Sequence, residues 1–156
     1  MIERRSVLPA GGPGGDLPDV NVWLALAIEE HPHHRAAAAY WDRDARIPKY
    51  FCRISAMSLV RLLTHPKLMG DKPLSLSKSW ALYRSFANLP GVSMLPEPDG
   101  LDTELAGLVT PRLPARLFTD AYFASLAKKA ALRLVTFDKD FERFDQLLAL
   151  RLPVGD

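Results

Sequence analysis

The feature that most constrains the fold is the alternation of short strand-like segments with longer segments of helical periodicity. Strands are expected over residues 17–21, 49–54, 92–95 and 133–137. Helices are expected over residues 22–30, 34–46, 55–65, from Ser75 or Ser77 to about 87, 101–109 and 119–131. Strands that alternate with helices form a parallel sheet with helices on its faces and right-handed crossovers. The expected fold class is therefore α/β with a central parallel sheet.

Capping residues and apolar stripes refine this outline. Ser55 is expected to cap a helix that Pro66 stops, and Thr119 is expected to cap the helix that follows it. The three tryptophans each fall on an apolar helical stripe, so core or dimer packing is expected for Trp23, Trp41 and Trp80. The alanine-rich helix that contains Trp41 offers an apolar surface that a twofold-related partner could cover.

The chain has the length of one domain, 156 residues. Residues 1–15 contain a run rich in glycine and proline, which is typical of a flexible, disordered leader or of an over-extended start. We therefore expect one folded domain over residues 16–156. No apolar run approaches the length of a membrane span, so no membrane association is expected.

Charge and cysteine content limit the partners and the compartment. The formal net charge of +2 is too small to indicate nucleic-acid binding by itself, although an acidic metal pocket rimmed by basic residues is compatible with it. Cys52 is the single cysteine, which excludes an intrachain disulfide. A reducing compartment such as the cytoplasm is therefore expected.

Three aspartates stand where elements begin or end. Asp19 and Asp138 each follow an expected strand, and Asp120 opens an expected helix. The ligand crevice of an open parallel sheet lies outside the carboxyl ends of its strands, so the three side chains are expected to converge there. Clustered carboxylates repel one another unless a cation binds or some are protonated, and Mg²⁺ prefers oxygen ligands. A metal-dependent enzyme acting on phosphate esters is the leading interpretation, and helix capping or turn formation is the alternative for each aspartate alone.

Several segments together resemble those of PIN-domain proteins, above all the VapC-type ribonuclease toxins of bacterial toxin–antitoxin pairs. The similar segments are Leu17–Val22, Phe118–Tyr122 and Leu134–Phe141 with Phe144. Residues 31–34 and 61–66 are also similar to one VapC subgroup. The resemblance spans residues 17 to about 145. It implies a three-layer α/β/α domain, Mg²⁺- or Mn²⁺-dependent RNA cleavage, homodimerisation and inhibition by a cognate VapB-like antitoxin.

The resulting mechanistic hypothesis assigns a role to each residue. Asp19 and Asp120 would hold the metal ion, and Asp138 would orient the attacking water or bind a second ion. Supporting contacts to these carboxylates are expected from Asn21, Thr136 and Asp140. The RNA phosphates are expected to contact Arg61 and Arg116, because a guanidinium group suits phosphate.

One position departs from the family's pattern. PIN nucleases commonly carry a glutamate in the helix after the second strand, one turn before an arginine, and here Ser58 takes that place. Ser58 can hold a metal-bound water but adds no charge. A PIN-like domain that binds RNA or a protein without cleaving RNA therefore remains the alternative. A phosphatase of the haloacid-dehalogenase type is disfavoured, because Asn21 stands where that family needs a second aspartate.

Overall fold

The computed structural model describes residues 14–70 and 72–154, so most of the expected leader lies outside the described residues. Its centre is a five-stranded sheet in the order β3-β2-β1-β4-β5, with every neighbouring pair parallel. The strands are β1 (Asp16–Pro18), β2 (Lys49–Phe51), β3 (Val92–Met94), β4 (Arg133–Thr136) and β5 (Ala149–Arg151). The predicted α/β class with a parallel sheet is confirmed. The edge strand β5 was not predicted, because it has three residues of which only Leu150 is buried.

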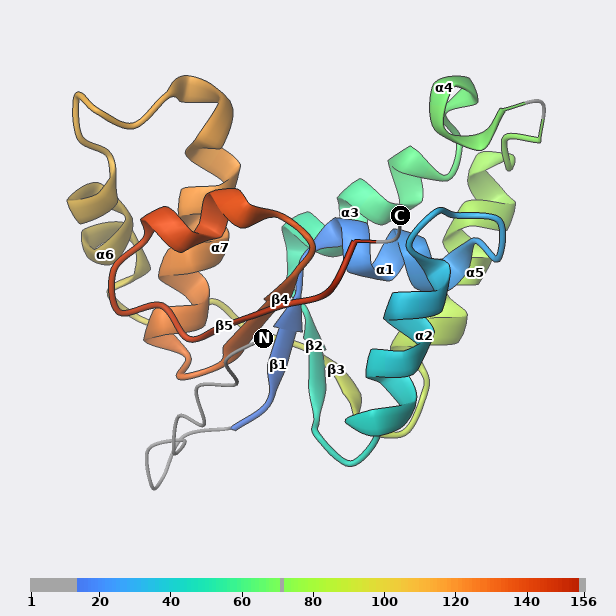
Figure 1. Ribbon diagram of the computed structural model, residues 1–156, viewed down its shortest axis with the longest axis horizontal. Helices are drawn as coiled ribbons and strands as arrows, with labels where there is room; N and C mark the ends of the chain where they lie inside the picture. The colour runs from blue at the N-terminus through green and yellow to red at the C-terminus, as the bar shows by residue number, and fades with distance from the viewer. Residues whose placement is uncertain (1–13, 71, 155–156) are drawn as a thin grey trace.

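Helices cover both faces of the sheet (Figure 1). They are α1 (Val20–Ala27), α2 (His34–Arg43), α3 (Arg53–Leu62), α4 (Pro66–Met69), α5 (Leu76–Ala87), α6 (Leu101–Leu108) and α7 (Phe118–Lys129), with 3₁₀ turns η1 (Ala115–Leu117) and η2 (Lys139–Arg143). Leu134 and Val135 are both fully buried, in different apolar clusters. Successive strand residues point to opposite faces, so both faces of β4 are covered and the three-layer architecture follows.

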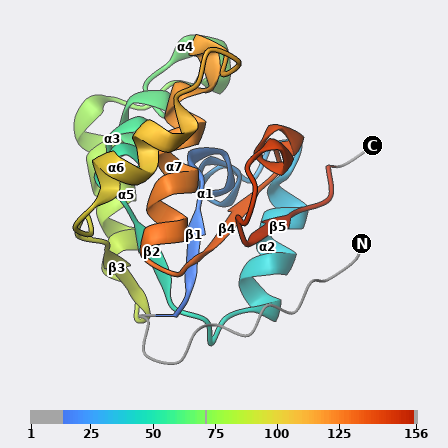
Figure 2. The same cartoon turned by 90° about the vertical axis from the view of Figure 1, so that its left-hand side faces the viewer.

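The layers differ in composition. Leu134 packs with α6 and α7, in a cluster that also contains Phe123 and Phe141. Val135 packs with α1 and α2 on the other face, and a further cluster joins α1, α3 and α5 to β2 and β3. The turned view shows α6 and α7 together on one side of the strands (Figure 2). Among the described residues, no helix has the length and apolar character needed to cross a membrane.

Several helix boundaries differ from the sequence-based expectations. Strand β1 ends at Pro18, and Asp19 already caps α1, because its carboxylate accepts two backbone N–H groups of the first turn. The cap of α3 is Cys52; Ser55 is the reciprocal partner three residues later, so its prediction as cap was wrong. Helix α7 begins at Phe118 without a side-chain cap, so the prediction of Thr119 as cap was also wrong.

The tryptophans divide into buried and exposed. Trp23 is fully buried and stacks on Phe51 with ring centroids 3.9 Å apart, and Trp41 packs against the edge of Trp23. Trp80 is 50% exposed, and its neighbour one turn earlier, Leu76, is also exposed. Of the two expectations for Trp80, core packing is excluded by this exposure, and dimer packing stays a prediction. The apolar stripe of α5 continues beyond the part of the helix that α3 covers.

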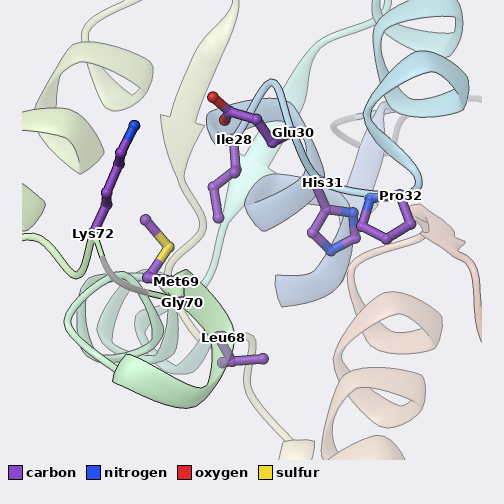
Figure 3. Close-up of a pocket in the computed structure, with 8 residues that line it drawn as sticks. All are labelled: Ile28, Glu30, His31, Pro32, Leu68, Met69, Gly70 and Lys72. Atoms are coloured by element: carbon purple, nitrogen blue, oxygen red, sulfur yellow. The ribbon is translucent and has the colours of Figure 1, made fainter.

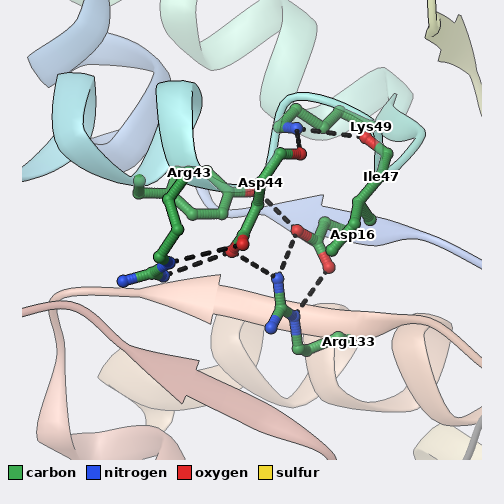
Figure 4. A network of polar contacts seen from close by, with 7 residues as sticks. Asp16, Arg43, Asp44, Ile47, Lys49 and Arg133 are labelled. Carbon is green, nitrogen blue, oxygen red and sulfur yellow. Dashed lines mark hydrogen bonds and ion pairs between the residues drawn. The ribbon is translucent and has the colours of Figure 1, made fainter.

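A buried ionic network joins β1, β4 and α2 at the amino-terminal edge of the sheet (Figure 4). Asp16 is 1% exposed and accepts two 2.8 Å hydrogen bonds from the Arg133 guanidinium and one of 2.6 Å from the Tyr40 hydroxyl. Arg133 also contacts Asp44, and Lys49 donates to the Asp44 carbonyl oxygen. These contacts hold β1 beside β4, whose opposite ends carry the candidate site.

Candidate active site

The acidic residues predicted from the sequence lie beyond the carboxyl ends of two neighbouring strands. Pro18 of β1 pairs with Val135 of β4, and the Asp19 backbone N–H donates to the Val135 carbonyl oxygen at 2.9 Å. Asp138 lies two residues after the end of β4 and caps η2, and Asp120 stands in the first turn of α7. Parallel pairing therefore brings residues 19 and 138 to the same edge of the sheet.

Asp19 is a buried carboxylate with defined hydrogen-bond partners. It is 5% exposed, and its Oδ1 accepts the backbone N–H groups of Asn21 and Val22 at 3.0 and 3.2 Å. Its Oδ2 accepts the hydroxyl of Thr136 at 2.5 Å. The same Thr136 oxygen accepts the backbone N–H of Asp138 at 2.9 Å. Thr136 thereby connects the carboxylate that follows β1 to the backbone that follows β4.

A second group of carboxylates lies beside Asp19. Among the described residues, oxygen atoms of Asp120, Asp138 and Asp140 lie within 4.8 Å of one another. Asp140 was expected only as a support for Asp138, and its backbone N–H does donate to Asp138 Oδ1 at 2.8 Å. Its own carboxylate, however, is also part of the group. Hard carboxylate oxygens at this spacing fit a divalent cation that prefers oxygen ligands.

Burial and mutual repulsion raise the pKa of two of these acids. Burial is the main cause that raises the pKa of Asp19 to about 6, and the charge of Asp120 adds to it. The pKa of Asp120 is also raised to about 6, first by burial and then by the charges of Asp138 and Asp140, while Arg116 opposes the shift. A bound cation would reverse both effects, because it favours the ionised carboxylates.

The other predicted residues lie in different places. Arg116 forms an ion pair with Asp140 at 3.3 Å, so it stands at the edge of the acidic group. Asn21 is exposed, and it contacts Asp19 through its backbone N–H. Ser58 is part-buried on α3, and its hydroxyl makes no hydrogen bond within the described part of the chain. Arg61 is exposed and lines an apolar groove between α3 and α5 with Trp80.

Sequence reasoning missed a polar pair near the carboxyl end of β3. The Tyr122 hydroxyl donates to Glu97 Oε1 at 2.8 Å, and burial together with this bond raises the pKa of Tyr122. Glu97 lies three residues after β3, between two prolines. The signal for the pair is weak, because Tyr122 and Glu97 are 25 residues apart.

The histidine-containing loop after α1 borders a cavity of about 390 Å³ whose other side is α4 and the residues after it (Figure 3). Ile28, His31 and Lys72 are among its lining residues. His31 Nδ1 accepts the backbone N–H of His33, and the His33 ring packs on Phe137 with centroids 4.8 Å apart. None of the clustered aspartates lines this cavity, which is therefore separate from the acidic group.

Comparisons with known proteins agree with this architecture. The family model of the PIN domain matches residues 17–147. Ribonuclease VapC41 of Mycobacterium tuberculosis is 37% identical over 134 residues, which cover 82% of this chain and 92% of that protein.

Solved structures share the fold at low sequence identity. Mycobacterium tuberculosis VapC20, a Sarcin-Ricin loop cleaving toxin, superposes with a TM-score of 0.64 at 17% identity, over 82% of this chain and 93% of that one. VapBC2 from Rickettsia felis, bound to a DNA fragment from its promoter, gives a TM-score of 0.62 at 15% identity, over 88% and 98% of the two chains. The family match and the identity to VapC41 show that this chain belongs to the VapC group of the PIN domain family.

Proposed function

We propose that this protein is an endoribonuclease that depends on Mg²⁺ or Mn²⁺ and acts as the toxin of a VapBC-type toxin–antitoxin pair. The observation that carries the proposal is a cluster of carboxylates whose one basic partner among the described residues is Arg116, which pairs with Asp140. Within the described residues, no lysine or arginine lies within 4.0 Å of the carboxylates of Asp19, Asp120 or Asp138. Partly buried acids without basic partners are unfavourable unless a cation joins them. The kinship with VapC41, a ribonuclease by name, supports RNA as the substrate.

Asp19, Asp120, Asp138 and Asp140 would hold the metal. A bound divalent cation acidifies a water molecule and neutralises charge on the scissile phosphate. Asp19 is held in one orientation by Thr136 and by the first turn of α1, so its carboxylate is already positioned before any ligand binds. Asp138 is fixed by the backbone N–H of Asp140. With the cation bound, Asp138 would orient the water that attacks the phosphodiester bond, or would bind a second ion.

Arg116 would guide the substrate into this site. Its side chain is 68% exposed, and among the described residues its guanidinium forms one ion pair, with the carboxylate of Asp140. It can therefore exchange that partner for a phosphate oxygen when RNA binds, because a guanidinium group pairs with either anion. Arg61 lies on the groove between α3 and α5 and is exposed, and its contact with an RNA phosphate stays a prediction.

The proposal is tested by RNA cleavage with the purified protein. Total bacterial RNA is incubated with Mg²⁺ or Mn²⁺ or with EDTA, and new 5′ ends are mapped by sequencing. Asp19→Asn and Asp120→Asn are each expected to lower the rate by roughly 100-fold or more, because each removes a charge that attracts the cation. Asp42→Asn, an exposed carboxylate on α2, is the matched control and is expected to keep full activity.

Two results would contradict the proposal. Cleavage that continues in EDTA would exclude the metal dependence. Binding of Mn²⁺ and of RNA without any new 5′ ends would instead favour a PIN-like domain that binds RNA without cleaving it, the alternative that Ser58 raises. Isothermal titration with Mn²⁺ separates this alternative from a protein with no metal site at all.

The proposed partners of the protein are an antitoxin and a second copy of the chain, and the proposed compartment is the cytoplasm. The name of the structural neighbour VapBC2 combines VapB and VapC, which supports a VapB-like partner here. Exposed apolar side chains on α3 and α5, namely Met57, Leu76 and Trp80, offer the surface that a homodimer would bury. Sedimentation velocity tests the dimer: the wild type should sediment as a dimer and Trp80→Ser as a monomer. A wild-type protein that sediments as a monomer would contradict the proposal.

A further inference from the structure

A second recess is lined by residues of α6, of α7, of η2 and of the segments that follow α6 and η2. Helices α6 and α7 lie together on one side of the sheet (Figure 1). The volume of the recess, about 580 Å³, is within the range of pockets that hold small ligands. Its polar lining residues are Thr110, Arg112, Lys128, Arg143, Asp145 and Gln146.

This recess carries an excess of positive charge. Within the described part of the chain, neither Arg112 nor Arg143 has a carboxylate oxygen within 4.0 Å. Arg143 instead donates a weak bond of 3.4 Å to the carbonyl oxygen of Arg112, which holds the two segments together. Lys128 is paired with Glu104 at 2.8 Å, and Asp145 is the one acidic residue among those that line the recess. The guanidinium groups of Arg112 and Arg143 can therefore each pair with a bound anion.

Two segments of the chain contribute both to the recess and to the acidic group or its edge. Asp140 and Arg143 belong to the same 3₁₀ turn, in which each residue advances about 2 Å, so their backbones lie roughly 6 Å apart along its axis. On the opposing segment, Arg112 precedes Arg116 by four residues, and Arg116 pairs with Asp140. Successive phosphates of one strand could therefore meet the acidic group and the recess in turn.

We propose that this basic recess binds the phosphodiester backbone of the RNA strand next to the bond that is cleaved, with Arg112 and Arg143 as the phosphate-binding residues. The inference rests on the proposed ribonuclease function and adds a binding site for the substrate. A guanidinium group suits phosphate because it can donate two parallel hydrogen bonds. The recess gives binding energy to the strand without contacting the reacting phosphate, so its loss should weaken RNA binding more than it slows the chemical step.

Fluorescence anisotropy measures this directly. A short fluorescein-labelled single-stranded RNA of mixed sequence is titrated with protein in EDTA, at several KCl concentrations. Arg112→Gln and Arg143→Gln are each expected to raise the Kd by roughly threefold to tenfold and to reduce the slope of log K against log salt by about 0.7. Arg46→Gln, an exposed arginine at the other end of the sheet, is the control and should change neither quantity.

A charge-conserving variant separates the contribution of the positive charge of Arg143 from that of its paired hydrogen bonds. Arg143→Lys keeps the charge and loses the paired hydrogen bonds, so it should keep the salt slope while its Kd lies between those of the wild type and Arg143→Gln. Unchanged Kd and salt slope in Arg112→Gln and Arg143→Gln would overturn the inference. Absence of cleavage by a wild-type protein whose RNA binding depends on the recess would overturn only the ribonuclease proposal, so the two failures are distinguishable.

Discussion

Replacement of the buried acid that follows β1 is expected to stabilise the metal-free protein while it removes function. The carboxyl group of Asp19 has a pKa of about 6 in the folded protein against an ordinary value of 3.8, mainly because it is buried. A folded-state pKa above the unfolded value means that stability is greatest when the group is protonated and falls as the pH rises from about 4 to 6. At about 1.36 kcal/mol for each pKa unit, ionisation at pH 7.5 costs about 3 kcal/mol.

Asp19→Asn removes most of this cost. Asparagine is also a good helix cap, so its amide oxygen can accept the two backbone N–H groups that begin α1. The hydroxyl of Thr136 loses its acceptor in this variant, which lowers the free energy of unfolding by about 1 kcal/mol. The net gain in the free energy of unfolding is about 2 kcal/mol, which for a domain of this size raises Tm by roughly 4 to 8 °C.

Thermal and urea unfolding in EDTA measure this gain at pH 7.5 and at pH 4.5. The gain should fall toward zero at the lower pH, where the wild-type carboxyl group is mostly protonated in the folded protein. Added Mn²⁺ should raise the Tm of the wild type and leave Asp19→Asn unchanged, because the variant has lost a ligand charge. Asp42→Asn on α2 should stay within about 0.5 kcal/mol of the wild type throughout. Destabilisation of Asp19→Asn at pH 7.5, or a gain that does not depend on pH, would refute the reasoning.

Three further predictions concern the site and the fold. Mn²⁺ affinity, followed by isothermal titration, should fall steeply as the pH drops through about 6, because protons compete with the cation for the two acids of raised pKa. Arg133→Met should lower the free energy of unfolding by about 3–5 kcal/mol in urea, because it leaves the buried Asp16 unpaired, whereas Arg43→Gln on the surface should cost less than about 1 kcal/mol. Ser58→Glu should slow RNA cleavage in a gel assay by crowding the substrate phosphate, and faster cleavage with tighter Mn²⁺ binding would contradict it.

Much of the fold could be read from local pattern. Apolar periodicity and strand–helix alternation predicted the parallel sheet and most of its helices, because these signals depend on residues close in sequence. The position of Asp19 after β1 and of Asp138 after β4 follows from the same pattern. Boundaries were less accurate where a side chain decides them: the thiol of Cys52, an uncommon cap, begins α3 three residues before Ser55.

What only the tertiary structure decided are the contacts between residues far apart in the chain. Thr136 meets Asp19 across 117 residues because β1 and β4 pair directly, and no local pattern states that strand order. The carboxylate of Asp140 joins the acidic group because η2 turns the chain back over the end of β4. Arg112 and Arg143 come to one recess for a related reason, since the packing of α6 and α7 sets where their segments meet. The sequence by itself therefore determined which residues are acidic and which elements carry them, and the packing of those elements determined which charges stand together.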